Sequence, residues 1–147
     1  MTRLLGANNE ELKELILYIT DKSKGDPRFG KTKLAKILFF IDMEYFFKTG
    51  KTFTGKDYQK LNNGPAMTCY IPVEKEMIQE QLIDHQDEPD AWPCVLTRTV
   101  PKRSPRLGYF SEHDRFIIDG VINSLWNENA KSLSEKSHGF VPAWDYL

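Results

Sequence analysis

Residues 25 to 32 carry the pattern in this chain that is most typical of phosphate binding. Gly25-Asp26-Pro27-Arg28-Phe29-Gly30-Lys31-Thr32 matches G-x-x-x-x-G-K-[ST], in which loop amides and a lysine hold phosphate groups. Such a loop should leave a hydrophobic strand, whereas an amphipathic segment ending in Asp21-Lys22-Ser23-Lys24 precedes it here. A loop glycine followed by a capped helix explains these residues better. A nucleotide-binding enzyme that uses Gly25–Thr32 remains one alternative.

Other catalytic and metal-binding patterns are weak. His85, His113 and His138 are widely separated, and none stands in H-E-x-x-H or another metal-ligand spacing. The chain has neither a G-x-S-x-G elbow nor a marked Cys/His arrangement for a nucleophile. We therefore expect a protein that is not an enzyme, with no catalytic residue, cofactor or metal. Cys69 and Cys94 favour a reduced compartment, although their spacing leaves a disulfide open.

Composition and charge indicate a soluble globular chain. Its 147 residues are 40% hydrophobic and 28% charged, which suits one domain with one core. No apolar run approaches the roughly 20 residues that a membrane span requires, and the N-terminal ten residues have no signal-peptide core. We expect a cytoplasmic protein without membrane contact.

The net charge of −1 argues against a dedicated nucleic-acid-binding protein, but the charges are unevenly spread. Lys22–Lys60 holds ten lysines and arginines against four acids, and Glu74–Asp90 holds seven acids against Lys75. Both runs are best explained as solvated helix faces and loops. A nucleic-acid-binding regulator is the second alternative, and it would use the first run together with Arg98, Lys102, Arg103 and Arg106.

Two helices are predicted in the first third of the chain. Asn8 or Asn9 can cap a surface helix that reaches about Ser23, because Leu12, Leu15, Ile16 and Ile19 share one face. Thr32 can cap a second helix to about Lys48, with Gly50 ending it in a left-handed conformation. Apolar residues cover most of this second helix, so it should be central and buried. Its Asp42 and Glu44 must then reach the rim or find hydrogen-bonding partners.

The rest of the chain predicts further short elements. Phe53–Leu61 should be a loop or irregular strand, and a helix from Pro65 or Ala66 to about Ile83 should be kinked at Pro72. The acidic segment Asp84–Pro93 is predicted as a loop. The other expected elements are a hairpin strand at Cys94–Val100, a helix with a Ser111–Asp114 capping box and Phe116, Ile117, Val121 and Leu125 on one face, and a last helix over Asn129–Ser137. The fold class is therefore mainly α: a single compact helical domain over residues 1–147, with about five or six helices and a small β-hairpin.

An ordered series of short motifs resembles the Panacea domain of the SocA-like antitoxin family. The series runs from roughly Lys31 to Trp144, and its pieces are Thr32–Phe40 with the K-L-x-K residues Lys33, Leu34 and Lys36, then Thr49-Gly50, Phe53-Thr54-Gly55, Asp57–Leu61, Asn63-Gly64-Pro65, Leu133–His138 and Pro142-Ala143-Trp144. Each piece alone is weak, but the order makes the series specific. The acidic stretch Asp84–Pro93 departs from it.

The resemblance implies a non-catalytic antitoxin that pairs with a cognate protein toxin and is often associated with phages. Some similar proteins are thought to deliver the toxin to a cellular protease, so a protease is an alternative partner. Among the matched residues, Lys33, Leu34 and Lys36 should be structural, Asn63, Gly64 and Pro65 should set a backbone turn, and His138 and Trp144 should order the closing segment. Tyr58 and Tyr70, which flank the turn, are the candidates for partner contact.

Overall fold

In this computed structural model, which describes residues 9–62, 64–89 and 95–128, the chain begins with a buried helix. Helix α1 spans Glu10–Lys22, with Asn9 at its N-cap position. The predicted apolar face is confirmed, because all four of its residues are buried. The prediction of a surface helix is wrong in one respect. Lys13, Glu14 and Thr20 are buried too, and Lys13 and Glu14 are paired with side chains of distant segments.

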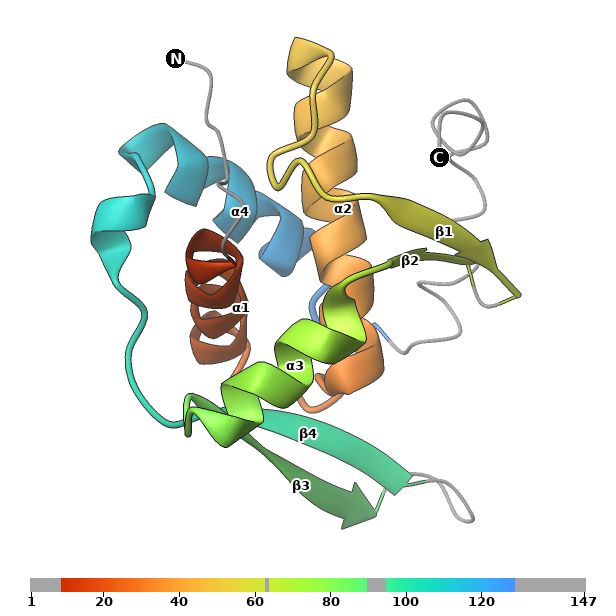
Figure 1. Cartoon of the computed structure of the whole chain (residues 1–147), viewed down its shortest axis with the longest axis vertical. Coiled ribbons are helices and arrows are strands. Elements are labelled where there is room, and N and C mark those ends of the chain that lie inside the picture. The colour runs from red at the N-terminus through yellow and green to blue at the C-terminus, as the bar shows by residue number, and fades with distance from the viewer. Residues whose placement is uncertain (1–8, 63, 90–94, 129–147) are drawn as a thin grey trace.

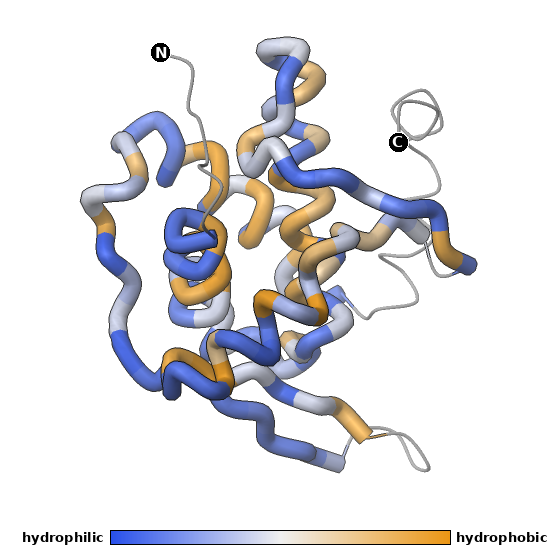
Figure 2. The backbone as a smooth tube through the Cα atoms, in the orientation of Figure 1, coloured by the Kyte–Doolittle hydropathy of each residue, from blue (hydrophilic) through white to orange (hydrophobic). Residues whose placement is uncertain are grey.

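Helix α2, Lys31–Thr49, passes through the middle of the molecule (Figure 1), as predicted. Most of its residues from Lys33 to Met43 are buried, and Figure 2 shows it as largely hydrophobic. Gly50 ends the helix at φ +80°, and its N–H donates to the carbonyl of Phe46. The start differs from the prediction. Gly30 takes the N-cap position, and Thr32 lies within the first turn.

The third helix begins later in the structure than the sequence predicted. Residues 58–67 include a short hairpin, with β1 at Tyr58–Leu61 and β2 at Gly64–Met67, in the register Tyr58↔Met67. Helix α3 then spans only Tyr70–Gln79. Pro72 is its third residue, where the missing N–H would have no helical acceptor, so it does not kink the helix. Pairing with β1 therefore prevails over the helix-start signal at Pro65.

The acidic segment predicted as a loop is a strand over its residues 84–89, and its residues 90–93 lie outside the described residues. β3, Ile83–Pro89, pairs antiparallel with β4, Val95–Pro101, in the register Ile83↔Pro101. The strand predicted at residues 94–100 is thus confirmed as half of a hairpin, although Cys94 lies outside the described residues. The buried Ile83 and the pairing with β4 outweigh the low strand propensity of the acidic residues. The described chain therefore has two hairpins, where one was predicted.

The last described helix begins with the predicted capping box. A 3₁₀ turn, η1 at Leu107–Tyr109, leads into α4, Glu112–Ser124. The Ser111 hydroxyl accepts from the Asp114 N–H, and the Asp114 carboxylate accepts from the Ser111 N–H. Ile117 and Val121 are buried as predicted. Phe116 is a wrong prediction, because its side chain is 77% exposed and Ile118 and Ile122 complete the buried face instead.

The described elements share one hydrophobic core, to which α1 and α2 contribute most. In Figure 1, α3 crosses in front of α2, the β3–β4 hairpin lies below α3, and the β1–β2 hairpin extends to one side. The mainly helical prediction is confirmed. Among described residues there are four α-helices and one 3₁₀ turn, fewer than the five or six helices expected, and the helix predicted at Asn129–Ser137 lies outside them. No described helix is long and apolar enough to cross a membrane.

Candidate functional site

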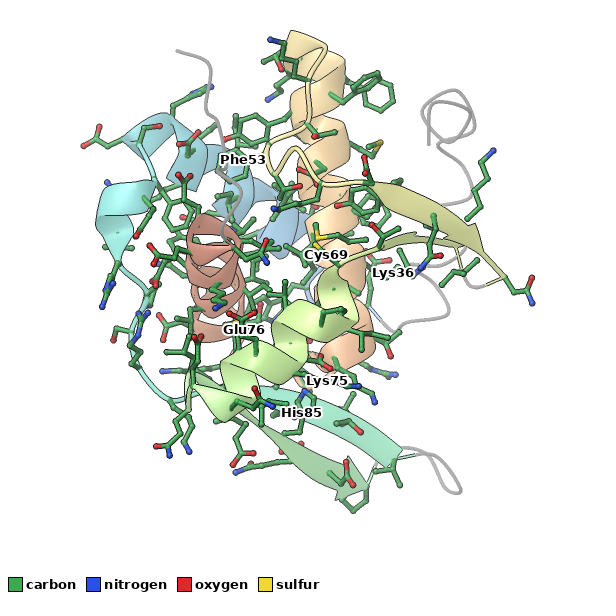
Figure 3. The ribbon with its side chains drawn as sticks, viewed as in Figure 1. Lys36, Phe53, Cys69, Lys75, Glu76 and His85 are labelled. Carbon is green, nitrogen blue, oxygen red and sulfur yellow. The ribbon has the colours of Figure 1, made fainter. Side chains whose placement is uncertain are left out.

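The K-L-x-K residues lie on the buried side of α2. Leu34 is fully buried in the core, and Lys33 is 1% exposed. The Lys33 ammonium donates to Oδ2 of Asp26 at 2.5 Å, and this carboxylate is buried as well. Lys36 is buried one turn further along the helix (Figure 3), and desolvation lowers the pKa of its ammonium. The K-L-x-K segment therefore packs inside the molecule.

Asp26 joins its own loop and the start of α2 to two segments that are distant in the sequence, β4 and the residues after α4. Its Oδ1 accepts from the backbone amides of Arg28, at 2.9 Å, and Asn127, at 3.2 Å. Its carbonyl accepts from the Arg98 guanidinium at 2.8 Å. The loop that matched a phosphate-binding pattern thus follows helix α1 instead of a strand, and it holds its own carboxylate against Lys33. The lysine of the phosphate-binding pattern is Lys31, which is exposed and is not the partner of Asp26.

A second buried carboxylate fixes the chain after α2. Asp42 is fully buried, and it accepts from the Thr54 amide at 2.8 Å and the Thr54 hydroxyl at 2.7 Å. The Tyr58 hydroxyl donates to its Oδ2 at 2.6 Å. Burial raises the pKa of the Asp42 carboxyl, and the hydrogen bonds from Thr54 and Tyr58 offset only part of this rise. The prediction that Asp42 must find partners is confirmed.

Tyr58 and Tyr70, the residues nominated for partner contact, are both largely buried. The hydroxyl of Tyr58 donates to Asp42, and burial raises the pKa of the Tyr58 hydroxyl well above the usual value. The hydroxyl of Tyr70 donates to the Lys31 carbonyl at 3.3 Å and ties α3 to the start of α2. Both tyrosines therefore have packing roles within the chain, and contact with a partner stays a prediction.

The predicted turn before α3 is the bend between β1 and β2. Gly64 has φ +111° and pairs with Leu61, and Pro65 pairs with Lys60. Both residues are buried. A positive φ at this bend explains why the sequence has glycine there. Asn63, His138 and Trp144 lie outside the described residues, so their predicted roles stay predictions.

Sequence reasoning missed two charged contacts that join α1 to later segments. Glu14 is 3% exposed; the Arg103 guanidinium contacts both of its oxygens, and the Arg106 amide donates to Oε1 at 2.8 Å. Burial opposes the charge on Glu14, but these donors outweigh it and lower its pKa. Lys13 donates to Glu76 at 2.6 Å and Glu80 at 2.9 Å. No local sequence pattern reports such pairs, because the partners are more than 60 residues apart.

These two contacts border a cleft of about 290 Å³ between α1, the end of α3 and the segment before α4. Leu82 and Tyr109 also line it. The carboxylate of Glu14 and the ammonium of Lys13 are already paired within the chain, so these two charged groups of the cleft do not need a ligand as a partner. In the part of the chain that is described, no group of three or more His, Cys, Asp or Glu residues is placed to hold a metal ion.

Comparison with known proteins gives one family. Residues 34–145 match the family described as antitoxin SocA-like, Panacea domain. The match covers well over half of the chain and nearly the whole span over which the motifs were found. No curated protein and no solved structure matches the chain.

Proposed function

Because the chain belongs to the SocA-like antitoxin family with a Panacea domain, we propose that it is an antitoxin that neutralises a cognate protein toxin by binding it directly. The family match over residues 34–145 carries this proposal. The finer claims, namely the binding itself, delivery of the toxin to a protease and an association with phages, are part of the proposal and rest on the family alone.

The geometry agrees with a binding role. The residues of the K-L-x-K segment and the two buried carboxylates, Asp26 and Asp42, hold α2, the loops and the hairpins in fixed positions. Their polar groups are used within the chain, so they stabilise a scaffold and leave recognition to the exposed surface. A rigid scaffold loses little conformational entropy when it binds, which favours a tight complex.

Co-expression with the neighbouring reading frame tests the proposed function. Induction of that frame alone should arrest growth, and co-expression of this chain should restore it, with the two proteins purifying as one complex. Full lethality of the toxin in the presence of folded, soluble antitoxin would contradict the proposal. The half-life of the toxin separates the two routes, because delivery to a protease shortens it and simple sequestration does not.

A further inference from the structure

Strand β3 has one open edge. Within the described residues it pairs only with β4, and the Lys102 amide continues that ladder by donating to the Leu82 carbonyl at 2.8 Å. Antiparallel ladders alternate, so the even-numbered residues of β3 bond to β4 and the odd-numbered residues direct N–H and C=O outward. The His85 amide agrees with this phase, because it donates to Oδ1 of Asp84 instead of to β4. Ile83 is buried, so the outward backbone groups that remain accessible at this edge are those of His85 and Asp87.

The other edge of the hairpin is already covered. Thr97 pairs with the odd-numbered Asp87, so by the same alternation its carbonyl points away from β3. This carbonyl oxygen lies only 2.7 Å from where a Cβ on Gly30 would stand. Arg98 also reaches from β4 to the carbonyl of Asp26. The start of α2 and the loop before it thus close the β4 side. A further strand can be added only at β3.

The charges of β3 restrict which strand can be added. Its side chains include Asp84, Asp87 and Glu88 and no lysine or arginine. Within the hairpin, the Thr97 hydroxyl donates to Asp87 and Arg98 pairs with Glu88, so no cation on the described part of β4 pairs with the carboxylates of Asp84 and Asp87. Figure 3 shows His85 on β3 below α3, where Lys75 and Glu76 lie. Charged edge strands resist pairing with unsuitable partners.

This charge excludes a second copy of the chain as the added strand. Pairing of β3 with another β3 would place acidic side chains opposite acidic side chains, which destabilises a sheet. Asp84 and Asp87 are three residues apart, so their side chains lie on opposite faces of the sheet. A strand that carries lysine or arginine on both of its faces would instead place a cation opposite each carboxylate. Open backbone groups would supply affinity, and the charge would supply specificity.

We propose that the outer edge of β3 binds an extended segment of the cognate toxin that carries lysine or arginine, as an added strand. The backbone groups of His85 and Asp87 form the new ladder, and the incoming strand displaces the Asp84 carboxylate from the His85 amide. The identity of the partner rests on the proposed function. The chemistry of the edge does not, so a peptide can test it separately.

The first experiment uses an acetylated, amidated heptapeptide of alternating lysine and valine, titrated to about millimolar concentration, a range suited to a contact of this size. NMR should show shifts and slower hydrogen exchange at the His85 and Asp87 amides, and a glutamate–valine peptide should cause neither. Asp87→Pro should abolish the effect. It removes an outward N–H and leaves the β4 ladder intact. Unchanged His85 and Asp87 amides in the presence of the lysine peptide would overturn the proposal.

The second experiment uses the purified toxin encoded by the neighbouring frame. Asp84→Lys/Asp87→Lys should weaken its binding about tenfold, because two favourable cross-strand charge pairs become repulsive. Asp57→Lys/Glu112→Lys is the matched control, since both residues are exposed and the net charge changes equally. It should bind as the unchanged chain does. Equal binding by both double variants, at equal thermal stability, would overturn the edge site, whereas failure of the unchanged chain to bind the toxin would contradict the proposed function alone.

Discussion

The ion pair of Asp26 and Lys33 is almost completely withdrawn from water, at 2% and 1% side-chain exposure. A buried pair of this kind adds little net stability compared with apolar residues, but loss of one partner leaves a charge without compensation. We expect Asp26→Ala to lower the free energy of unfolding by about 3–5 kcal/mol. Urea denaturation measures the change.

A second variant separates the charge from the other contacts of Asp26. Asp26→Ala/Lys33→Met replaces the stranded ammonium with an apolar side chain and should recover much of the loss. The amides of Arg28 and Asn127 remain without their acceptor, so recovery should be incomplete. A double variant no more stable than Asp26→Ala would show that the uncompensated charge is not the cause.

Glu14 should make stability depend on pH. Its pKa in the folded chain lies below the usual 4.5, because the donors from Arg103 and Arg106 outweigh desolvation. The contribution is therefore fully present above pH 4.5 and is lost as the pH falls through the folded pKa. The difference in unfolding free energy between the unchanged chain and Glu14→Gln should shrink between pH 5 and pH 3 in urea melts, roughly the range over which a carboxylate of lowered pKa is protonated. A constant difference would contradict the lowered pKa.

At the residue scale, the sequence shows which buried polar groups need a partner better than it shows which residues supply that partner. It showed that Asp42 on a buried helix must find donors, and the donors from Thr54 and Tyr58 lie only 12 and 16 residues away. It did not show that Asp26 would face Lys33 and Asn127, or that Glu14 would face Arg103. Such pairs are set by the packing of whole elements, which residue spacing along one element does not report.

Two glycines of the helices should respond to alanine with opposite signs. Gly50 ends α2 at φ +80°, where an L side chain is strained, so Gly50→Ala should destabilise the chain by about 1 kcal/mol. Gly120 lies within α4, and a Cβ there meets no atom within 4 Å. Gly120→Ala should therefore stabilise the chain by roughly 0.5–1 kcal/mol. Thermal melts of the two variants measure both, and shifts of the same sign would contradict this account.

Elements with strong local signals were predicted, and elements that depend on pairing were not. The periodicity of α1, the largely apolar surface of α2 and the capping box of α4 are contained within each helix. β2 and β3 lack such signals. Each of these strands forms because a partner strand lies beside it, as in the register Ile83↔Pro101, and pairing of this kind costs loop closure that no local pattern reveals.

At the scale of the whole molecule, the sequence could predict one mainly helical body but could not place the hairpins on it. The amount of apolar sequence on α1, α2 and α4 indicates a shared core, and Figure 2 shows β3 as largely hydrophilic. The β3–β4 hairpin is joined to the core through contacts of individual residues. One is the close approach of Gly30, at the start of α2, to β4.

Substitution of Gly30 tests this junction. A Cβ there would lie 2.7 Å from the Thr97 carbonyl and 2.8 Å from Cδ1 of Leu96. The leucine can change rotamer, but the carbonyl belongs to the sheet, so Gly30→Ala should push the hairpin away and cost about 1–3 kcal/mol. Gly25→Ala is the matched control, since its Cβ would stand 3.4 Å from the Trp126 ring, an ordinary contact. Urea melts should show a much smaller loss for it, and hydrogen exchange should quicken in β4 only for Gly30→Ala. Equal losses for the two variants would mean that α2 and the hairpin are not packed this closely.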